Sequence, residues 1–176
     1  EGALVIAGRR FAVRAQTGLY VMPGEAFAIE ASEAMTFYLW QGPGGDGLVL
    51  LDEMPGNFDA AHPDRAEEIA ADQRQAMAAR YFQLLVDARH GSTLMTQFQG
   101  NIPYSKAEPH RHLYEEILVV LDGEGMVWGE ALKAPIGPGD VLFLPAKAVH
   151  SLQCVSPEGL NLVGVIYPGN NPSINY

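Results

Sequence analysis

The sequence is poor in cysteine, and this shortage excludes two kinds of site. Cys154 is the only cysteine in 176 residues, so the chain has no intrachain disulfide framework and no zinc site built from cysteines. A single unpaired thiol also suits a reducing compartment, and we therefore expect a cytoplasmic protein.

Positive charge and long apolar runs are scarce as well. Lysine and arginine total 11 against 21 aspartates and glutamates, which gives a net charge of −10 at pH 7. Such a surface repels phosphate backbones and anionic lipids, so neither nucleic acid nor a membrane is expected as a partner. No uninterrupted apolar run approaches the roughly 18 residues that a membrane-spanning helix needs.

Short runs rich in valine, leucine, isoleucine and aromatic residues are what the chain has in abundance. From Thr93 onward they include "TLMTQFQG", "EEILVVLDGEG", "GDVLFLPA" and "LNLVGVIYPG", and residues 1–51 show the same pattern. These are strand lengths separated by turn residues, which is typical of a β-sandwich or barrel. The sequence therefore predicts an all-β fold.

The segment between these regions has a different composition. Residues 64–81 are rich in alanine, glutamate, glutamine and arginine, and Pro63 stands where the first turn of a helix tolerates it. We predict one helix over about residues 64–81 that rests on a barrel through its apolar positions, namely Ala66, Ile69, Ala70, Met77 and Phe82. The predicted division is then 1–54 as a first half, 55–92 as a linker and 93–176 as a barrel.

The two β regions also resemble each other. An ungapped shift of 115 residues places Gly8 on Gly123 and Pro23-Gly24 on Pro138-Gly139, so the turns coincide although few residues are identical. This favours a duplicated β domain over an N-terminal sheet of unrelated origin. The positions equivalent to residues 110 and 112 would precede Glu1, so the first half is expected to be a degenerate or partial barrel.

The stretch "PHRHLYEE", residues 109–116, contains candidate metal ligands. Alternate side chains of a strand face the same side, so His110 and His112 can both point into a barrel, and Glu116 can join them after a turn. The later run "GPGDVLFLPAKAVH" ends at His150. Three imidazoles and one carboxylate suit a first-row divalent cation and leave coordination positions open.

These residues resemble the cupin family. In its first motif a glycine precedes H-x-H, a glutamate and a second glycine, and His110, His112, Glu116 and Gly123 fall in register; Gly139, Pro145 and His150 match the second motif. The resemblance implies a double-stranded β-helix, or jelly-roll barrel. It also implies that His110, His112, Glu116 and His150 bind one divalent transition metal: Fe, Mn, Ni or Zn.

The motifs depart from the family pattern at three positions. Tyr104 replaces a glycine of the first motif, and in the second Lys147 replaces a glycine and Cys154 an asparagine. None of these changes removes a ligand. Six residues on or beside the strands that border the site are candidates for the wall of a substrate pocket: Tyr104, Lys106, Trp128, Phe143, Leu152 and Cys154.

The resemblance implies a metal-dependent enzyme that acts on a small oxygen-rich molecule. A dioxygenase is marginally favoured over an isomerase, lyase or decarboxylase, because sites of three histidines and one glutamate are common among cupin dioxygenases. The alternative is a non-catalytic cupin module that binds a small ligand or a metal. Cupin barrels commonly pair through their sheets, so a homodimer is expected.

Overall fold

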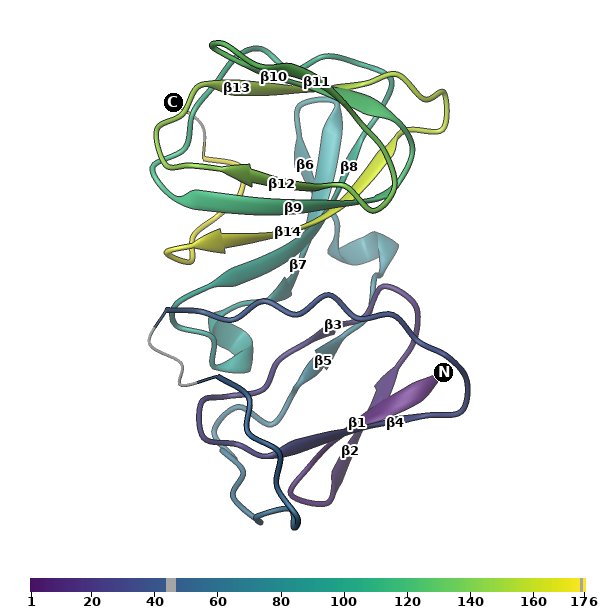
Figure 1. Cartoon of the computed structure of the whole chain (residues 1–176), viewed down its shortest axis with the longest axis vertical. Helices are drawn as coiled ribbons and strands as arrows, with labels where there is room; N and C mark the ends of the chain where they lie inside the picture. The colour runs from purple at the N-terminus through teal and green to yellow at the C-terminus, as the bar shows by residue number, and fades with distance from the viewer. Residues whose placement is uncertain (44–46, 175) are drawn as a thin grey trace.

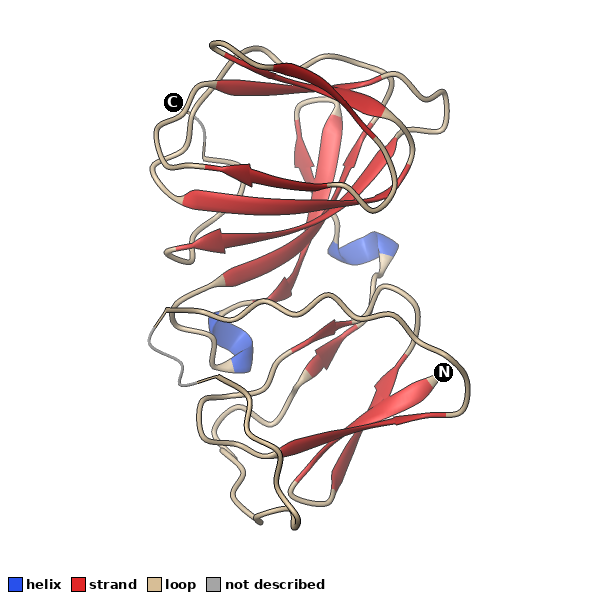
Figure 2. Ribbon diagram, viewed as in Figure 1, coloured by secondary structure: helices blue, strands red, loops and turns tan. Residues whose placement is uncertain are grey.

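Two lobes built of β-strands make up the chain in a computed structural model that describes residues 1–43, 47–174 and 176 (Figure 1). Within these residues the only helical turns are two short 3-10 segments, η1 (Ala71–Gln73) and η2 (Ala88–His90) (Figure 2). The prediction of an all-β fold is confirmed. In the part of the chain that is described, no helix is long and apolar enough to cross a membrane.

The C-terminal lobe consists of two facing sheets. Six strands form one sheet in the order β12-β9-β14-β8-β7-β6, and three form the other in the order β11-β10-β13. Their ladders are antiparallel. The strands are β6 (Gln75–Met77), β7 (Arg80–Val86), β8 (Thr96–Ile102), β9 (Glu115–Asp122), β10 (Gly125–Gly129), β11 (Lys133–Ile136), β12 (Val141–Leu144), β13 (His150–Cys154) and β14 (Leu160–Tyr167). The predicted jelly-roll barrel is confirmed.

Alternation along the strands explains how this lobe closes. In β12, Leu142 and Leu144 are buried while Val141 and Phe143 are exposed, as expected for a sheet with one face toward the core. The core between the two sheets includes Phe82, Phe98, Leu118, Val120, Val127, Leu142, Leu152, Leu160 and Ile166. The barrel is therefore filled by side chains from strands that are far apart in the sequence.

The N-terminal lobe is smaller. Its sheets have the orders β2-β1-β4 and β3-β5 and enclose a core of Leu4, Ile6 and Val13. The strands are β1 (Gly2–Ile6), β2 (Arg9–Val13), β3 (Gly18–Leu19), β4 (Phe27–Ala31) and β5 (Ala66–Glu67). Gly18 lets β3 approach β7 closely, because a Cβ atom at this position would lie 2.5 Å from the Cβ of Leu85.

The predicted helix over residues 64–81 is wrong. This segment contains β5, which pairs with β3, then the short turn η1, and then β6, which forms a hairpin with β7. Residues predicted as a linker thus contribute strands to both lobes. Met77 and Phe82 do pack on the barrel core, but from adjacent strands of the hairpin.

Tertiary contacts explain why helix propensity does not determine the conformation of residues 64–81. The buried side chain of Gln83 donates from Nε2 to the carbonyl of Glu68 and accepts at Oε1 from the amide of Ala70, both at 2.8 Å. These bonds satisfy backbone groups in the extended conformation that a helix would satisfy internally. Alanine-rich composition is only a weak preference, which such contacts override.

The predicted internal repeat has partial counterparts in the fold. The shift of 115 residues that takes Gly8 to Gly123 brings β1, β2, β3 and β4 onto β9, β10, β11 and β12, and the turn glycines at positions 8, 24, 123 and 139 all have positive φ. The sheets differ, however, because β1 pairs with β2 whereas β9 and β10 lie in separate sheets. The duplication stays a prediction.

A buried ion pair holds the loops of the N-terminal lobe together. Arg65 is fully buried, and its Nη2 lies 2.9 Å from Oε1 of Glu25. Glu25 also accepts hydrogen bonds from the amides of Met22 and Asp59. Burial raises the pKa of Glu25, but the bonds from Arg65 and the two amides outweigh it, so the pKa lies below its ordinary value.

We expect Glu25→Ala to lower the free energy of unfolding by about 3 kcal/mol or more, because it leaves Arg65 buried without its carboxylate. Since the pKa of Glu25 is lowered in the folded state, its stabilisation is present at neutral pH and is lost as the pH falls below the ordinary carboxyl range of about 4.3. Urea unfolding of both proteins at several pH values measures this effect.

Glu30→Ala is the matched control, because Glu30 pairs with Arg10 at the surface. Its cost should stay below about 1 kcal/mol. Equal losses in the two variants would contradict a special role for the buried pair.

Candidate metal centre

Backbone pairing brings the two histidine segments together. His110 and His150 form an antiparallel bridge in which each amide donates to the carbonyl of the other at 2.9 Å. The carbonyl of His112 accepts from the amide of Lys147 at 2.7 Å. These bonds place the loop before β9 beside the start of β13, so residues about forty positions apart share one site.

The three histidine side chains converge. A nitrogen of each ring lies within 4.8 Å of a nitrogen of the other two, and Nε2 of His112 lies 3.4 Å from Oε2 of Glu116. His112, Glu116 and His150 are buried, and His110 is partly exposed. The structure therefore brings the three predicted histidine ligands together and places the predicted ligand Glu116 beside His112.

The other nitrogen of each ring is fixed by the backbone. Nδ1 of His110 lies 2.9 Å from the carbonyl oxygen of Glu108, Nδ1 of His150 lies 2.9 Å from that of Ala148, and Nδ1 of His112 lies 3.1 Å from that of Ile174. A neutral imidazole that donates from Nδ1 presents its Nε2 lone pair on the opposite side. This arrangement orients histidine ligands in metal sites.

Alternation along β9 selects the carboxylate. Glu116 is buried and faces the histidines, whereas Glu115 is exposed. Successive side chains of a strand point to opposite faces, so only one of these two neighbouring carboxylates can face the site.

The electrostatics of the rings favour neutral imidazoles at two positions. Burial lowers the pKa of His110 and of His150 below the ordinary value. Burial acts in the same direction on His112, but the hydrogen bond and charge of Glu116 outweigh it and raise its pKa. Neutral imidazole is the form that binds a metal.

Tyr114 supports the buried side of the site. Its ring stacks on His112 with centroids 4.6 Å apart, and its hydroxyl donates to the carbonyl of Pro172 at 3.1 Å. Burial and the charge of Glu116 raise the pKa of this hydroxyl, so it stays protonated. The segment that follows β14 thus holds both His112, through Ile174, and Tyr114.

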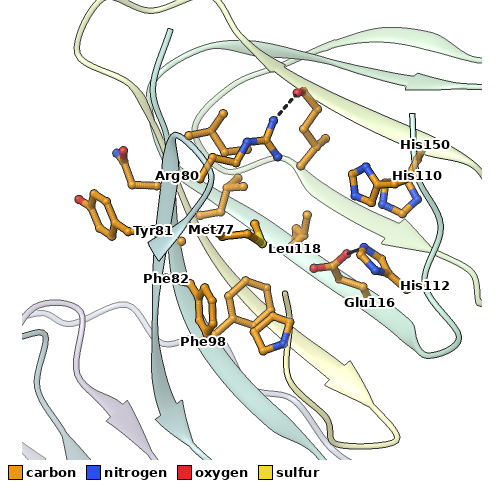
Figure 3. A pocket seen from close by; sticks show the side chains of 16 residues that line it. Met77, Arg80, Tyr81, Phe82, Phe98, His110, His112, Glu116, Leu118 and His150 are labelled. Carbon is orange, nitrogen blue, oxygen red and sulfur yellow. Dashed lines mark hydrogen bonds and ion pairs between the residues drawn. The ribbon is translucent and has the colours of Figure 1, made fainter. Parts of the chain in front are cut away.

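A cavity opens beside the four predicted ligands (Figure 3). Its wall combines apolar and polar side chains, and the strands that contribute to it are β6, β7, β8, β9, β13 and β14. The lining residues besides the predicted ligands include Met77, Arg80, Tyr81, Phe82, Phe98, Asn101, Ile102, Leu118, Leu152 and Leu162.

Of the six predicted pocket residues, Leu152 lines this cavity. The other five lie elsewhere. Tyr104 and Phe143 are 71% and 57% exposed, Lys106 lies over the ring of Trp128 with Nζ 3.8 Å from its centroid, and Cys154 packs in the core. Phe143 is on the outward face of β12, and Trp128 donates to Gln153.

The wall residues that sequence reasoning missed come from the β6–β7 hairpin and from β8. Met77, Arg80 and Tyr81 lie at or near the turn of the hairpin. The sequence assigned them to a helix, and no motif near them marks a site. Their role follows only from the pairing of β7 with β8, which brings the hairpin to the cavity.

The comparisons with known proteins agree with this geometry. A family model described as "Cupin domain" matches residues 102–166. No curated protein matches the chain.

Several solved structures share the barrel. A RmlC-like cupin from Shewanella frigidimarina is 17% identical, with a TM-score of 0.51, over 60% of this chain and 94% of its own. KdgF from a Halomonas species is 17% identical, with a TM-score of 0.50, over 60% and 97%. A Cupin 2 conserved barrel domain protein from Salinispora arenicola is 16% identical, with a TM-score of 0.51, over 57% and 86%. Identities this low show the fold alone.

We expect the purified protein to take up one equivalent of a divalent transition metal, and His112→Ala to weaken this binding. Loss of a ligand should cost more than the roughly 10- to 100-fold in affinity that loss of an outer-shell partner costs. Elemental analysis after dialysis against each metal measures the content, and circular dichroism checks that the barrel is intact.

Glu115→Gln serves as the control, because it removes one carboxylate from the exposed face of the same strand. Its metal content should match that of the wild type. Full metal content in His112→Ala would contradict the assignment of the site.

Proposed function

The C-terminal barrel is a cupin domain, and we propose that it is a metal-dependent enzyme that acts on a small, oxygen-rich organic molecule. One observation supports the proposal: three imidazoles, each with Nδ1 beside a backbone carbonyl, have ring nitrogens within 4.8 Å of one another and line one cavity.

The donor set fits a divalent transition metal. Imidazole nitrogen with one carboxylate suits Fe, Mn, Ni or Zn, and His110, His112, His150 and Glu116 would hold the ion. A metal bound there supplies Lewis-acid polarisation of substrate oxygens or, if it is iron, redox chemistry with dioxygen. Four protein ligands leave positions free for a substrate that carries two adjacent oxygens, such as a hydroxy-ketone, a catechol, an enol or a 2-oxo acid.

The residues of the chain prepare the site in three ways. The carbonyls of Glu108, Ala148 and Ile174 hold the rings in place before any ligand arrives. Glu116 brings a negative charge that offsets a cation. Phe82, Phe98 and Leu118 exclude water and strengthen electrostatic interactions with a bound substrate.

Among the possible reactions we place dioxygenation first, ahead of isomerisation, elimination and decarboxylation. The reason is that the set of three histidines and one glutamate resembles that of cupin dioxygenases. The competing role, a module that binds a ligand without turnover, uses the same residues, so an activity measurement must separate them.

We expect the protein loaded with Fe(II) to convert at least one chelating substrate, and His112→Ala to abolish turnover while the barrel stays folded. A screen of diketones, catechols, hydroxy acids and sugar acids against Fe(II), Mn(II), Ni(II) and Zn(II) tests this, with an oxygen electrode and mass spectrometry as readouts.

Oxygen uptake with Fe(II) would assign a dioxygenase, and conversion without oxygen would assign isomerase, lyase or decarboxylase chemistry. If ligands bind but none is converted with any metal, the binding module replaces the enzyme.

We also propose that the chain forms a homodimer through the six-stranded sheet. Among the described strands β12 is at an edge of this sheet, and it exposes Val141 and Phe143. Edges of this kind pair readily with another chain.

Light scattering should therefore give twice the chain mass of 19.1 kDa at micromolar concentration, and Phe143→Asp should shift the protein toward the monomer. Leu132→Asp is the control, since Leu132 is equally exposed but lies between β10 and β11 of the other sheet. A monomeric wild type would contradict the dimer.

A further inference from the structure

One positively charged side chain reaches into the same cavity as the histidines. Arg80 begins β7, directly after the turn that follows Met77, and it extends between the two sheets (Figure 3). Its Nη2 donates to the carbonyl of Leu152 at 3.1 Å, and Leu152 lies two residues after His150 on β13. Arg80 therefore reaches from β7 of the six-stranded sheet to β13 of the other sheet, and it lines the same cavity as the predicted ligands.

Most of the hydrogen-bonding capacity of this guanidinium is unused. Arg80 is partly buried, and an arginine has five N–H donors that favour hydrogen-bond partners wherever they are shielded from water. Within residues 1–43, 47–174 and 176, no carboxylate lies within 4.0 Å of Arg80 in an ion pair, and the carbonyl of Leu152 is its hydrogen-bond acceptor.

Arg65 shows how this protein satisfies an arginine that has only a structural role. Its donors bind the carboxylate of Glu25 and the carbonyls of His62 and Asp59, and its guanidinium lies 4.6 Å from the centroid of the Phe58 ring. The partners of Arg65 all come from the chain itself. Arg80 has one such partner and faces a cavity instead.

The charge of Arg80 acts on the predicted metal site. Burial lowers the pKa of His110, and the charge of Arg80 adds to this effect. The chain as a whole carries a net charge of −10, so this local positive charge opposes the general charge of the protein. A cation among the histidines would add to it and make the cavity attractive to an anion.

We propose that Arg80 binds a carboxylate of the substrate, so that the substrate carries an anionic group as well as the oxygens that reach the metal. This inference rests on the proposed function, which assigns the other end of the substrate to the metal. The apolar wall formed by Met77, Phe82 and Leu118 then contacts the carbon skeleton between the two ends. Arg80 would set specificity by pairing two N–H groups with one carboxylate.

A matched pair of ligands tests this assignment. Protocatechuate is a catechol that carries a carboxylate, and protocatechuamide replaces this group by a neutral amide of the same shape. Calorimetric titration of both into the zinc-loaded protein measures the two dissociation constants. We expect the wild type to bind the carboxylate roughly 10- to 100-fold more tightly, as a charge-assisted hydrogen bond provides.

Arg80→Met should remove this preference, because the carboxylate loses more affinity than the amide, while the zinc content stays unchanged. Arg80→Lys should keep part of it, because it keeps the charge but loses the planar fork. Arg74→Met is the control: it removes one positive charge from an exposed residue that directly precedes β6 and stacks on Tyr81, and the preference should survive.

Equal binding of the two ligands by the wild type, binding of neither, or a preference that survives in Arg80→Met would overturn the role of Arg80. If the wild type takes up no zinc, the metal centre of the proposed function fails by itself. The same titrations with the metal-free protein then decide about Arg80: a preference for the carboxylate that depends on Arg80 supports its role, and no preference ends it.

Discussion

The backbone bridge between His110 and His150 is the constraint on which the rest of the site depends. It joins the loop before β9 to the first residue of β13, and these segments belong to different sheets of the barrel. The rings of His110 and His150 are then oriented by a hydrogen bond between Nδ1 and the carbonyl oxygen two residues earlier in the chain. Convergence of the rings is thus a property of the closed barrel, since neither segment alone presents more than part of the ligand set.

The fold class and the predicted ligands could be derived from the sequence because the signals are local. H-x-H places two side chains on one face of an extended segment, and alternation at the start of β9 separates buried Glu116 from exposed Glu115. The turn glycines mark the ends of strands; Gly123, for example, adopts the positive φ that such a turn requires. These signals predict the face on which each side chain lies, whereas the grouping of His150 with the other ligands was implied by the resemblance to cupins.

The cavity wall could not be derived in this way, because it depends on which strands become neighbours. Residues 64–81 have the composition of a helix, yet β6 and β7 extend the sheet beyond β8 and bring Met77 and Arg80 to the site. Conversely, Phe143 is close in sequence to His150 but alternates outward, and Cys154 lies on a buried face that belongs to the core. Distance along the chain is a poor guide to distance in a barrel.

The two lobes are linked through the same strand that carries Arg80. Gln83 of β7 binds the backbone of residues 68 and 70, and Gly18 lets β3 pack against Leu85. The N-terminal lobe therefore packs against β7 through Gln83 and Leu85. Arg65 forms its ion pair with Glu25 inside this lobe. Burial of an arginine alone does not indicate function here, because Arg65 is the more buried of the two. The two arginines differ in their surroundings: the donors of Arg65 bind groups of its own lobe, whereas Arg80 lines the cavity that the three clustered histidines also line.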